Sequence, residues 1–244
     1  GKLKEAKEEY INSIKRSQNV FTVWHQLLMI DFELGNYESV ITTGDDCLNY
    51  FPNQGIVYFL KGISMLQLKQ FELSIKVFKN GLDLAFGNRV LKAELLSNLG
   101  EAYYRIQDYS KSDSSFIAAI NIDSSNAVTL NNFSFYLSER DTNLLLALKY
   151  IARAVKIKPS QASFEDTYAW ILYRLGRFKE ARKWIEKALI NGGNESPVIV
   201  DHFGDILFKL DDKDKAMEQW IKAKELGLDT DELKSKIENK NLDE

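Results

Sequence analysis

The sequence predicts an all-α protein in which helical hairpins stack into a solenoid, and three observations support this fold class. Apolar residues follow three- and four-residue spacing in both halves of residues 162–193, and Gly176 separates the two halves. Prolines lie between such hairpins, where helices must stop: Pro52, Pro159 and Pro197. A small residue opens the second helix of each hairpin at intervals of 34 to 38 residues: Ala6, Val40, Ser74, Ser112, Ala147, Ala181 and Ala216. A single hairpin cannot bury its apolar face, so neighbouring hairpins must cover it.

The predicted second helices share one face. A second small residue follows the first by seven positions in every copy: Ser13, Cys47, Gly81, Ala119, Ala154, Ala188 and Ala223. Between the two stands a bulky residue in all copies but one: Tyr10, Gly44, Phe78, Phe116, Ile151, Ile185 and Trp220. The small positions let another helix approach while the bulky side chain fills the gap. Gly44 departs from this pattern, and Leu28 holds the small first-helix position of the same hairpin, so we expect the two to exchange volume.

The first helices carry a matching pattern, in which a bulky residue, a small residue and a third apolar residue one turn later recur. Leu99–Gly100 with Tyr103 and Phe203–Gly204 with Leu207 show it. With the small and bulky residues of the second helices and the closing prolines, the chain resembles the tetratricopeptide repeat family, whose unit is roughly 34 residues long. Its C-terminal half is similar to repeat blocks of bacterial, often envelope-associated, members. The resemblance implies a right-handed α-α superhelix with a concave face lined by first helices.

The expected organisation is a single repeat array over residues 1–244. It starts with the second helix of a truncated repeat at 2–18 and continues with complete repeats at 21–54, 55–88, 93–126, 127–161, 162–196 and 197–230. A helix at 229–240, with Thr230 or Asp229 as N-cap, has a charged outer face and caps the array. Because the chain opens inside a second-type helix, we expect the natural N-terminus to lie upstream of Gly1.

Composition and charge argue against several functions. Hydrophobic residues make up 45% and charged residues 27%, which is ordinary for a globular protein. A formal net charge of −3 argues against nucleic acid as a partner. No apolar run approaches the roughly 18 residues of a membrane span. The one cysteine, Cys47, cannot form an intramolecular disulfide and is read as a small apolar residue at a repeat position.

Catalytic and metal-binding patterns are weak, so the chain is predicted not to be an enzyme and to hold neither metal nor cofactor. His25 and His202 lie several repeats apart and cannot share a site. Asp201 precedes His202, but adjacent helical residues do not face each other. The acidic run of Asp211, Asp212 and Asp214 lacks the glycine and distal glutamate of a calcium loop and reads as a solvated turn.

The predicted function is a non-catalytic scaffold that binds a peptide or helix of a partner protein in its concave groove. First-helix positions facing that groove are mostly apolar in the first two repeats, while the later ones mix acids, amides, Arg and aromatic residues, the usual anchors of protein-binding surfaces. Asn131 and its neighbour Asn132 offer amide donors and acceptors to a peptide backbone. The candidate partner-binding residues are Asn131, Asp166, Trp170, Tyr173, Arg174, Asp201, Asp205, Tyr104 and Arg105.

Two alternatives stay open at this point. The apolar face from Ile56 to Leu66 and the open N-terminal helix suit self-association into a homo-oligomer. An accessory role for an enzyme would need a catalytic domain upstream of Gly1. The compartment is not determined by the sequence. The resemblance favours the bacterial cell envelope, on the periplasmic side and anchored through the missing N-terminus, with the cytoplasm as the alternative.

Overall fold

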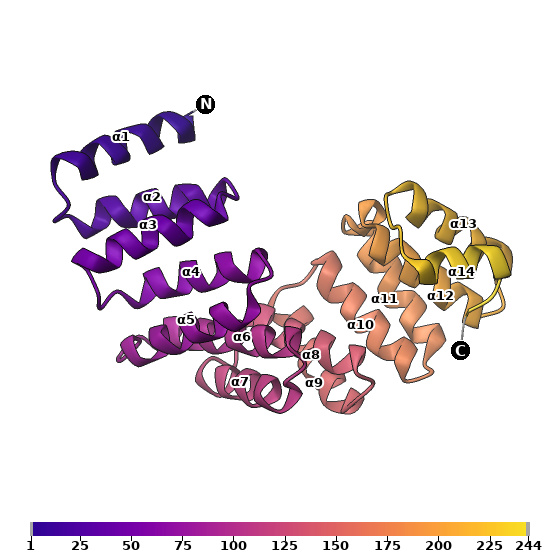
Figure 1. The fold of residues 1–244 in the computed structure, drawn as a ribbon. Coiled ribbons are helices and arrows are strands. Elements are labelled where there is room, and N and C mark those ends of the chain that lie inside the picture. Colours follow the sequence, from indigo (N-terminus) through magenta and orange to yellow (C-terminus); the bar gives the residue numbers. More distant parts are fainter. Residues whose placement is uncertain (1, 243–244) are drawn as a thin grey trace. The chain divides into compact units, whose positions relative to one another are not determined.

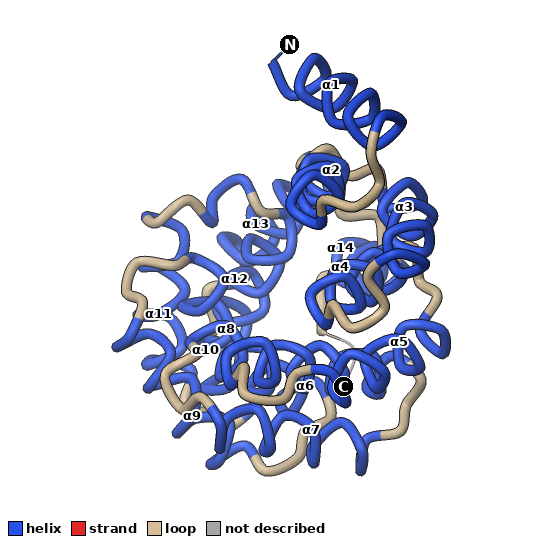
Figure 2. Tube along the Cα trace, turned by 90° about the vertical axis from the view of Figure 1, so that its left-hand side faces the viewer, coloured by secondary structure: helices blue, strands red, loops and turns tan. Residues whose placement is uncertain are grey.

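The computed structural model describes residues 2–242 and confirms the all-α fold class. Its secondary structure consists of helices joined by short connections, and the described part of the chain contains no strand (Figures 1 and 2). No helix in this part combines the length and apolar character needed to cross a membrane. The chain divides into two compact units, Gly1–Ser124 and Ser125–Glu244, which are considered separately.

The N-terminal unit contains seven helices, and successive helices pack against one another. Each hairpin pairs a first helix with the second helix that follows it, so α2 packs on α3, α4 on α5 and α6 on α7. The lone helix α1 packs on α2. The bounds are α1 Lys2–Arg16, α2 Phe21–Glu33, α3 Tyr37–Tyr50, α4 Gly55–Gln67, α5 Phe71–Leu84, α6 Arg89–Arg105 and α7 Tyr109–Ile122.

The C-terminal unit repeats this arrangement and ends in a shorter helix, α14, which packs on α13. The Thr230 hydroxyl caps α14 by accepting a hydrogen bond from the Leu233 backbone N–H at 3.2 Å. A 3-10 turn, η1, connects α11 to α12. The bounds are α8 Ala127–Glu139, α9 Leu144–Ile157, α10 Ala162–Arg174, α11 Phe178–Ile190, η1 Gly193–Glu195, α12 Pro197–Lys209, α13 Lys213–Glu225 and α14 Asp231–Asn239.

The small and bulky positions of the repeat pattern form the core of each hairpin. A Cβ added to Gly62 would lie 2.2 Å from the Phe78 ring, and one added to Gly204 would lie 2.5 Å from the Trp220 indole. In these hairpins the bulky residue of the second helix therefore packs directly on the backbone of its first helix, which explains why glycine stands there. From α3 onward both small positions of every second helix are buried, and Cys47 is fully buried among apolar residues.

The expected exchange of volume between Leu28 and Gly44 is not what fills the space beside Gly44. A Cβ on Gly44 would meet the Lys61 stem at 2.7 Å, so the next hairpin fills the gap. Lys61 buries its methylenes there and extends its ammonium to the exposed Asp45. Leu28 is fully buried in the apolar cluster around Val40 and Cys47.

Each hairpin turns at a residue in the left-handed conformation. The backbone N–H of the following residue donates to a carbonyl five residues earlier at 2.8 to 3.1 Å, as in a Schellman cap. Asp211 is one of these residues, so part of the acidic run lies in a turn as expected, while Asp212 is the N-cap of α13 and Asp214 lies in its first turn. The six left-handed residues are Gly35, Lys69, Gln107, Asp141, Gly176 and Asp211.

Candidate functional site

Seven of the nine expected partner-binding residues lie on the first helices of the C-terminal unit. We call them the first-helix surface, and they are Asn131 on α8, Asp166, Trp170, Tyr173 and Arg174 on α10, and Asp201 and Asp205 on α12. The other two, Tyr104 and Arg105, end α6 in the N-terminal unit. The expected set is therefore divided between the two units.

Aromatic rings form a stack on the first-helix surface. The Trp170 indole lies 4.1 Å from the His202 ring at an interplanar angle of 13°. On the same helix, the Tyr173 ring lies 4.8 Å from Trp170 at 7°. Parallel rings at these separations restrict one another's rotamers. The three rings therefore form one continuous stack on this surface.

His202 connects this stack to the acidic residues of the surface. Its Nδ1 lies 2.8 Å from Asp166 Oδ1, and both side chains are largely buried. Burial lowers the pKa of His202, but the carboxylates of Asp166, Asp205 and Asp201 outweigh it and raise the pKa to about 9. The imidazole is consequently protonated at neutral pH, and both ring nitrogens act as donors.

A second cation, Lys236 of α14, neutralises the remaining acids. Its Nζ lies 2.9 Å from Asp205 and 3.2 Å from Asp201, and the side chain is almost fully buried. Asp205 also accepts a hydrogen bond from Trp220 Nε1 at 2.9 Å. Burial raises the pKa of Asp205 to about 6, with Asp201 adding to the rise and Lys236 opposing it. The pKa of Lys236 is raised because attraction to Asp205 and Asp201 exceeds the effect of burial.

The Asp166–His202 and Asp201–Lys236 contacts occupy equivalent positions on successive helices. Asp166 and Asp201 are each the fifth residue of a first helix, and their cations, His202 and Lys236, are each the sixth residue of the next helix of that kind. Helix α14 is thus held to α12 as α12 is held to α10. We call each such pair an acid–cation staple.

The staples change the interpretation of three expected binding residues. Asp166 and Asp205 are less than a tenth exposed, and Asp201 is largely buried against Lys236. Their carboxylates hold neighbouring helices together and so position the surface. In the sequence His202 stands beside Asp201 and far from Asp166. The signal that identifies its real partner is the separation of 36 residues, about one repeat.

Two buried polar atoms on the first-helix surface have no hydrogen-bond partner among the described residues. They are Asn131 Oδ1 and Trp170 Nε1. The Asn131 amide donates to Asn132 Oδ1 at 3.2 Å, so its own carbonyl is left over. An acceptor and a donor are therefore both available here.

Tyr173 and Arg174 line a hollow of about 240 Å³ at the end of α10. Arg174 forms an ion pair with the exposed Asp141 at 3.3 Å, and about a third of the Arg174 side chain is exposed. Burial, followed by the nearby Asp205, raises the pKa of Tyr173 to about 12, so its hydroxyl stays protonated. Phe178 and Lys209 complete the wall.

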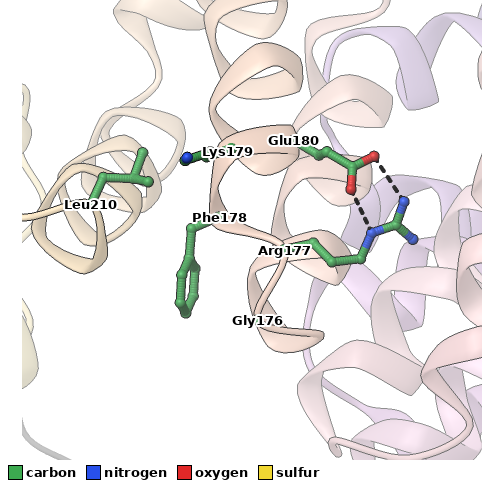
Figure 3. A pocket seen from close by; sticks show the side chains of 6 residues that line it. All are labelled: Gly176, Arg177, Phe178, Lys179, Glu180 and Leu210. Carbon is green, nitrogen blue, oxygen red and sulfur yellow. Dashed lines mark hydrogen bonds and ion pairs between the residues drawn. The ribbon is translucent and has the colours of Figure 1, made fainter.

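A larger hollow of about 330 Å³ adjoins Phe178 (Figure 3). Figure 3 shows the Phe178 ring pointing away from its helix, with Leu210 across the opening. Arg177 forms two hydrogen bonds of 2.8 Å with Glu180 on the far side. The two hollows share Gly176 and Phe178, so they adjoin at this turn.

In the N-terminal unit, Tyr104 and Arg105 lie near another hairpin turn. The Tyr104 ring is 5.5 Å from Tyr109, and Arg105 forms an ion pair with Glu101 at 3.3 Å. Arg105 also lines a hollow of about 190 Å³. On α4, Phe59 and Ile63 are partly buried against the core.

The remaining candidates for chemistry are structural. His25 lies on α2 and stacks on Phe21 at 5.9 Å. Within residues 2–242, no group of three or more His, Cys, Asp or Glu side chains has an arrangement that could hold a metal ion. Burial raises the pKa of Cys47 to about 11, so the thiol is protonated and unreactive at neutral pH.

Comparison with known proteins identifies the repeat. The sequence model of the tetratricopeptide repeat matches residues 93–126 and 167–189. The chain carries tetratricopeptide repeats. These TPR units and the TPR proteins that the fold resembles support a protein-interaction scaffold.

Two relatives share part of the TPR array. A STIP1 homologue of Dictyostelium discoideum is 37% identical over 100 residues, which cover 40% of this chain and 17% of the relative. A TPR repeat-containing protein of Pseudomonas aeruginosa is 33% identical over 64 residues, 26% of this chain and 11% of the relative. The chain therefore spans less than a fifth of the length of either relative.

Solved TPR structures match the fold at low sequence identity. A tetratricopeptide repeat protein from Parabacteroides merdae has a TM-score of 0.72 at 14% identity, covering 98% of this chain and 92% of its own. YrrB, described as a TPR protein with an unusual peptide-binding site, has a TM-score of 0.56 at 16% identity and covers 75% of this chain and 92% of its own. At these identities the likeness shows the fold alone.

Proposed function

We propose that the chain is a scaffold that holds a segment of a partner protein on the first-helix surface of its C-terminal unit. The observation that carries the proposal is the hollow beside Tyr173 and Arg174. Aromatic residues and arginine are the side chains that most often anchor protein interfaces, and here they line a concavity. The likeness to YrrB, a TPR protein with a peptide-binding site, is consistent with it.

The surface is organised in advance, which favours binding. The stack of Tyr173, Trp170 and His202 fixes the aromatic rings, and the staple from Asp166 fixes the imidazole. Immobilising a side chain at an interface costs about 0.5–1.5 kcal/mol, so rings that are already fixed lose less on binding. In this proposal Asp166, Asp201 and Asp205 position the surface, whereas Tyr173 and Arg174 contact the partner.

The unpaired atoms suit an extended backbone. A buried polar atom without a partner costs about 1–3 kcal/mol. A peptide N–H could donate to Asn131 Oδ1, and a small rotation of this side chain on binding would recover part of that cost. The proposal assigns no catalytic step to the chain.

Affinity capture from a lysate of the source cells tests the proposal, using the wild-type chain and an Arg174→Glu variant side by side. The matched control is Lys158→Glu, a charge reversal at an exposed residue that directly follows α9, at the end away from the α8–α9 turn. We expect a protein that is retained by the wild type and the control and is reduced about tenfold by Arg174→Glu. Equal retention by all three would remove Arg174 from the binding surface. Far-ultraviolet circular dichroism checks that each variant is folded.

A further inference from the structure

The two hollows beside Phe178 are lined by more basic than acidic residues. Their walls carry four cations, Arg174, Arg177, Lys179 and Lys209, against two acids, Asp141 and Glu180. The local formal charge is therefore +2 on a chain whose net charge is −3. We call this region, made of the residues that line the two hollows, the turn edge.

Two of these cations are not neutralised within the chain. Arg174 is paired with Asp141, and Arg177 forms a two-bond pair with Glu180. Lys209 is exposed and forms no ion pair in the described part of the chain, and Lys179, whose amine lies near Leu210 in Figure 3, forms none either. Positive charge next to an aromatic ring is thus available to a ligand.

A ring beside basic residues also occurs at the equivalent turn of the N-terminal unit, where Arg105 is paired with Glu101. The hollow there has Phe71 as its ring, and Phe71, like Phe178, is the first residue of a second helix. Arg105 takes the place of Lys209, and each is the last residue of the next first helix. That hollow also contains two cations and one acid, Lys69 and Arg105 against Glu101. The two turns therefore share a ring and a basic residue at equivalent positions, and the C-terminal turn differs in that its basic residue, Lys209, forms no ion pair among the described residues.

From this geometry we infer that the turn edge binds an acidic segment of a partner protein, in which carboxylates flank an aromatic or aliphatic side chain. The apolar side chain packs on Phe178, and its acidic neighbours pair with Lys209 and Lys179. Lysine and arginine bind carboxylates by charge-assisted hydrogen bonds, while the ring gains contact area only from an apolar group. The inference rests on the proposed function and adds the chemistry of the partner.

The test is an array of immobilised short peptides of randomised sequence, probed with the fluorescently labelled chain. For the wild type we expect the retained peptides to be enriched in Asp and Glu next to Phe, Tyr or Leu. Lys209→Glu should weaken these peptides about tenfold and shift the retained set towards Lys and Arg. Lys158→Glu, with the same change of charge at the other end of a hairpin, should retain the wild-type set.

A second variant separates recognition from structure. Asp141 is 57% exposed and competes for Arg174, so Asp141→Asn should strengthen binding of acidic peptides by releasing that guanidinium. A purely structural role for the ion pair would weaken binding instead.

The outcomes distinguish the two proposals. Peptides retained without acidic enrichment, or unchanged by Lys209→Glu, would overturn the acidic-partner inference and leave the scaffold proposal standing. No retained peptide for any variant would overturn both. Preferential retention of a short labelled RNA in place of acidic peptides would also overturn the inference, because the cations would then serve phosphates.

Discussion

Each of the two units buries an aspartate, and the pKa values of the two carboxyl groups are shifted in opposite directions. Asp31 of the N-terminal unit is fully buried and accepts hydrogen bonds from Lys7, Asn36 and Ser39. Burial raises the pKa of Asp31, but these donors lower it by more than burial raises it. The pKa is therefore below its ordinary value. Asp205 of the C-terminal unit lies beside a second acid, Asp201, and its pKa rises to about 6.

Burial alone therefore does not decide whether an acid is ionised in the folded protein. Asp31 accepts hydrogen bonds from three donors, so its ionised form is favoured in the folded state. Asp205 and Asp201 share Lys236, and the charge of His202 adds a smaller attraction for Asp205. Lys236, from the final helix of the C-terminal unit, is thus the cation in direct contact with both acids.

Removing that cation should have the largest effect. Lys236→Met keeps the stem but leaves Asp201 and Asp205 buried without their cation, which should cost about 3–5 kcal/mol of unfolding free energy at neutral pH. Urea denaturation followed by tryptophan fluorescence measures it, because Trp220 contacts Asp205. The further change Asp205→Asn should restore part of the loss. A cost below about 1 kcal/mol for Lys236→Met would mean that the staple does not hold α14.

The His202 staple should make stability fall at alkaline pH. The folded pKa of about 9 lies above the ordinary 6.5, so the folded state retains a proton that the unfolded state has released. This contribution is complete below pH 6.5 and is lost as the pH rises towards 9, on the order of 2–3 kcal/mol in all. Denaturation curves at several pH values should show a slope for the wild type that is absent in His202→Gln. Identical slopes would contradict the staple.

Asp31 should show the opposite dependence with a smaller effect. Asp31→Asn should cost about 1–3 kcal/mol at neutral pH, because Lys7 loses its charged acceptor. The folded pKa is depressed, so the wild-type advantage is present above the ordinary pKa of 3.8 and shrinks as the pH falls below it. The measurement is the difference in denaturation midpoint between the two proteins across the acid range. A difference that persists undiminished at the lowest pH would contradict the account.

Repetition in the sequence predicted the fold, but the partners of individual side chains needed the structure. Small and bulky residues at fixed intervals predict which faces pack, because helical geometry fixes those faces. An acid–cation staple forms only where a basic side chain of the next first helix comes close to an aspartate, and the repeat pattern does not show this. The pairing of His202 with Asp166 and of Lys236 with Asp201 was therefore not predicted. Lys61 beside Gly44 was missed for the same reason, since its flexible stem crosses between hairpins.

The candidate site was predictable in part. Helix position alone placed Trp170, Tyr173 and Arg174 on one surface, and the structure brings Trp170 and Tyr173 into a stack. Partner binding by these residues stays a prediction. Helix position could not show that Asp166 and Asp205 are paired with cations, or that Phe178 lines two hollows.

The most direct test of the account is to locate the partner on α11 by photo-cross-linking. p-Benzoylphenylalanine would replace Phe178, the first residue of this helix, and in a second protein the exposed Ile190, the last. After irradiation in a lysate of the source cells, we predict that one partner cross-links at position 178 and not at position 190. Cross-linking of that partner at both positions, or only at position 190, would contradict binding at the turn edge.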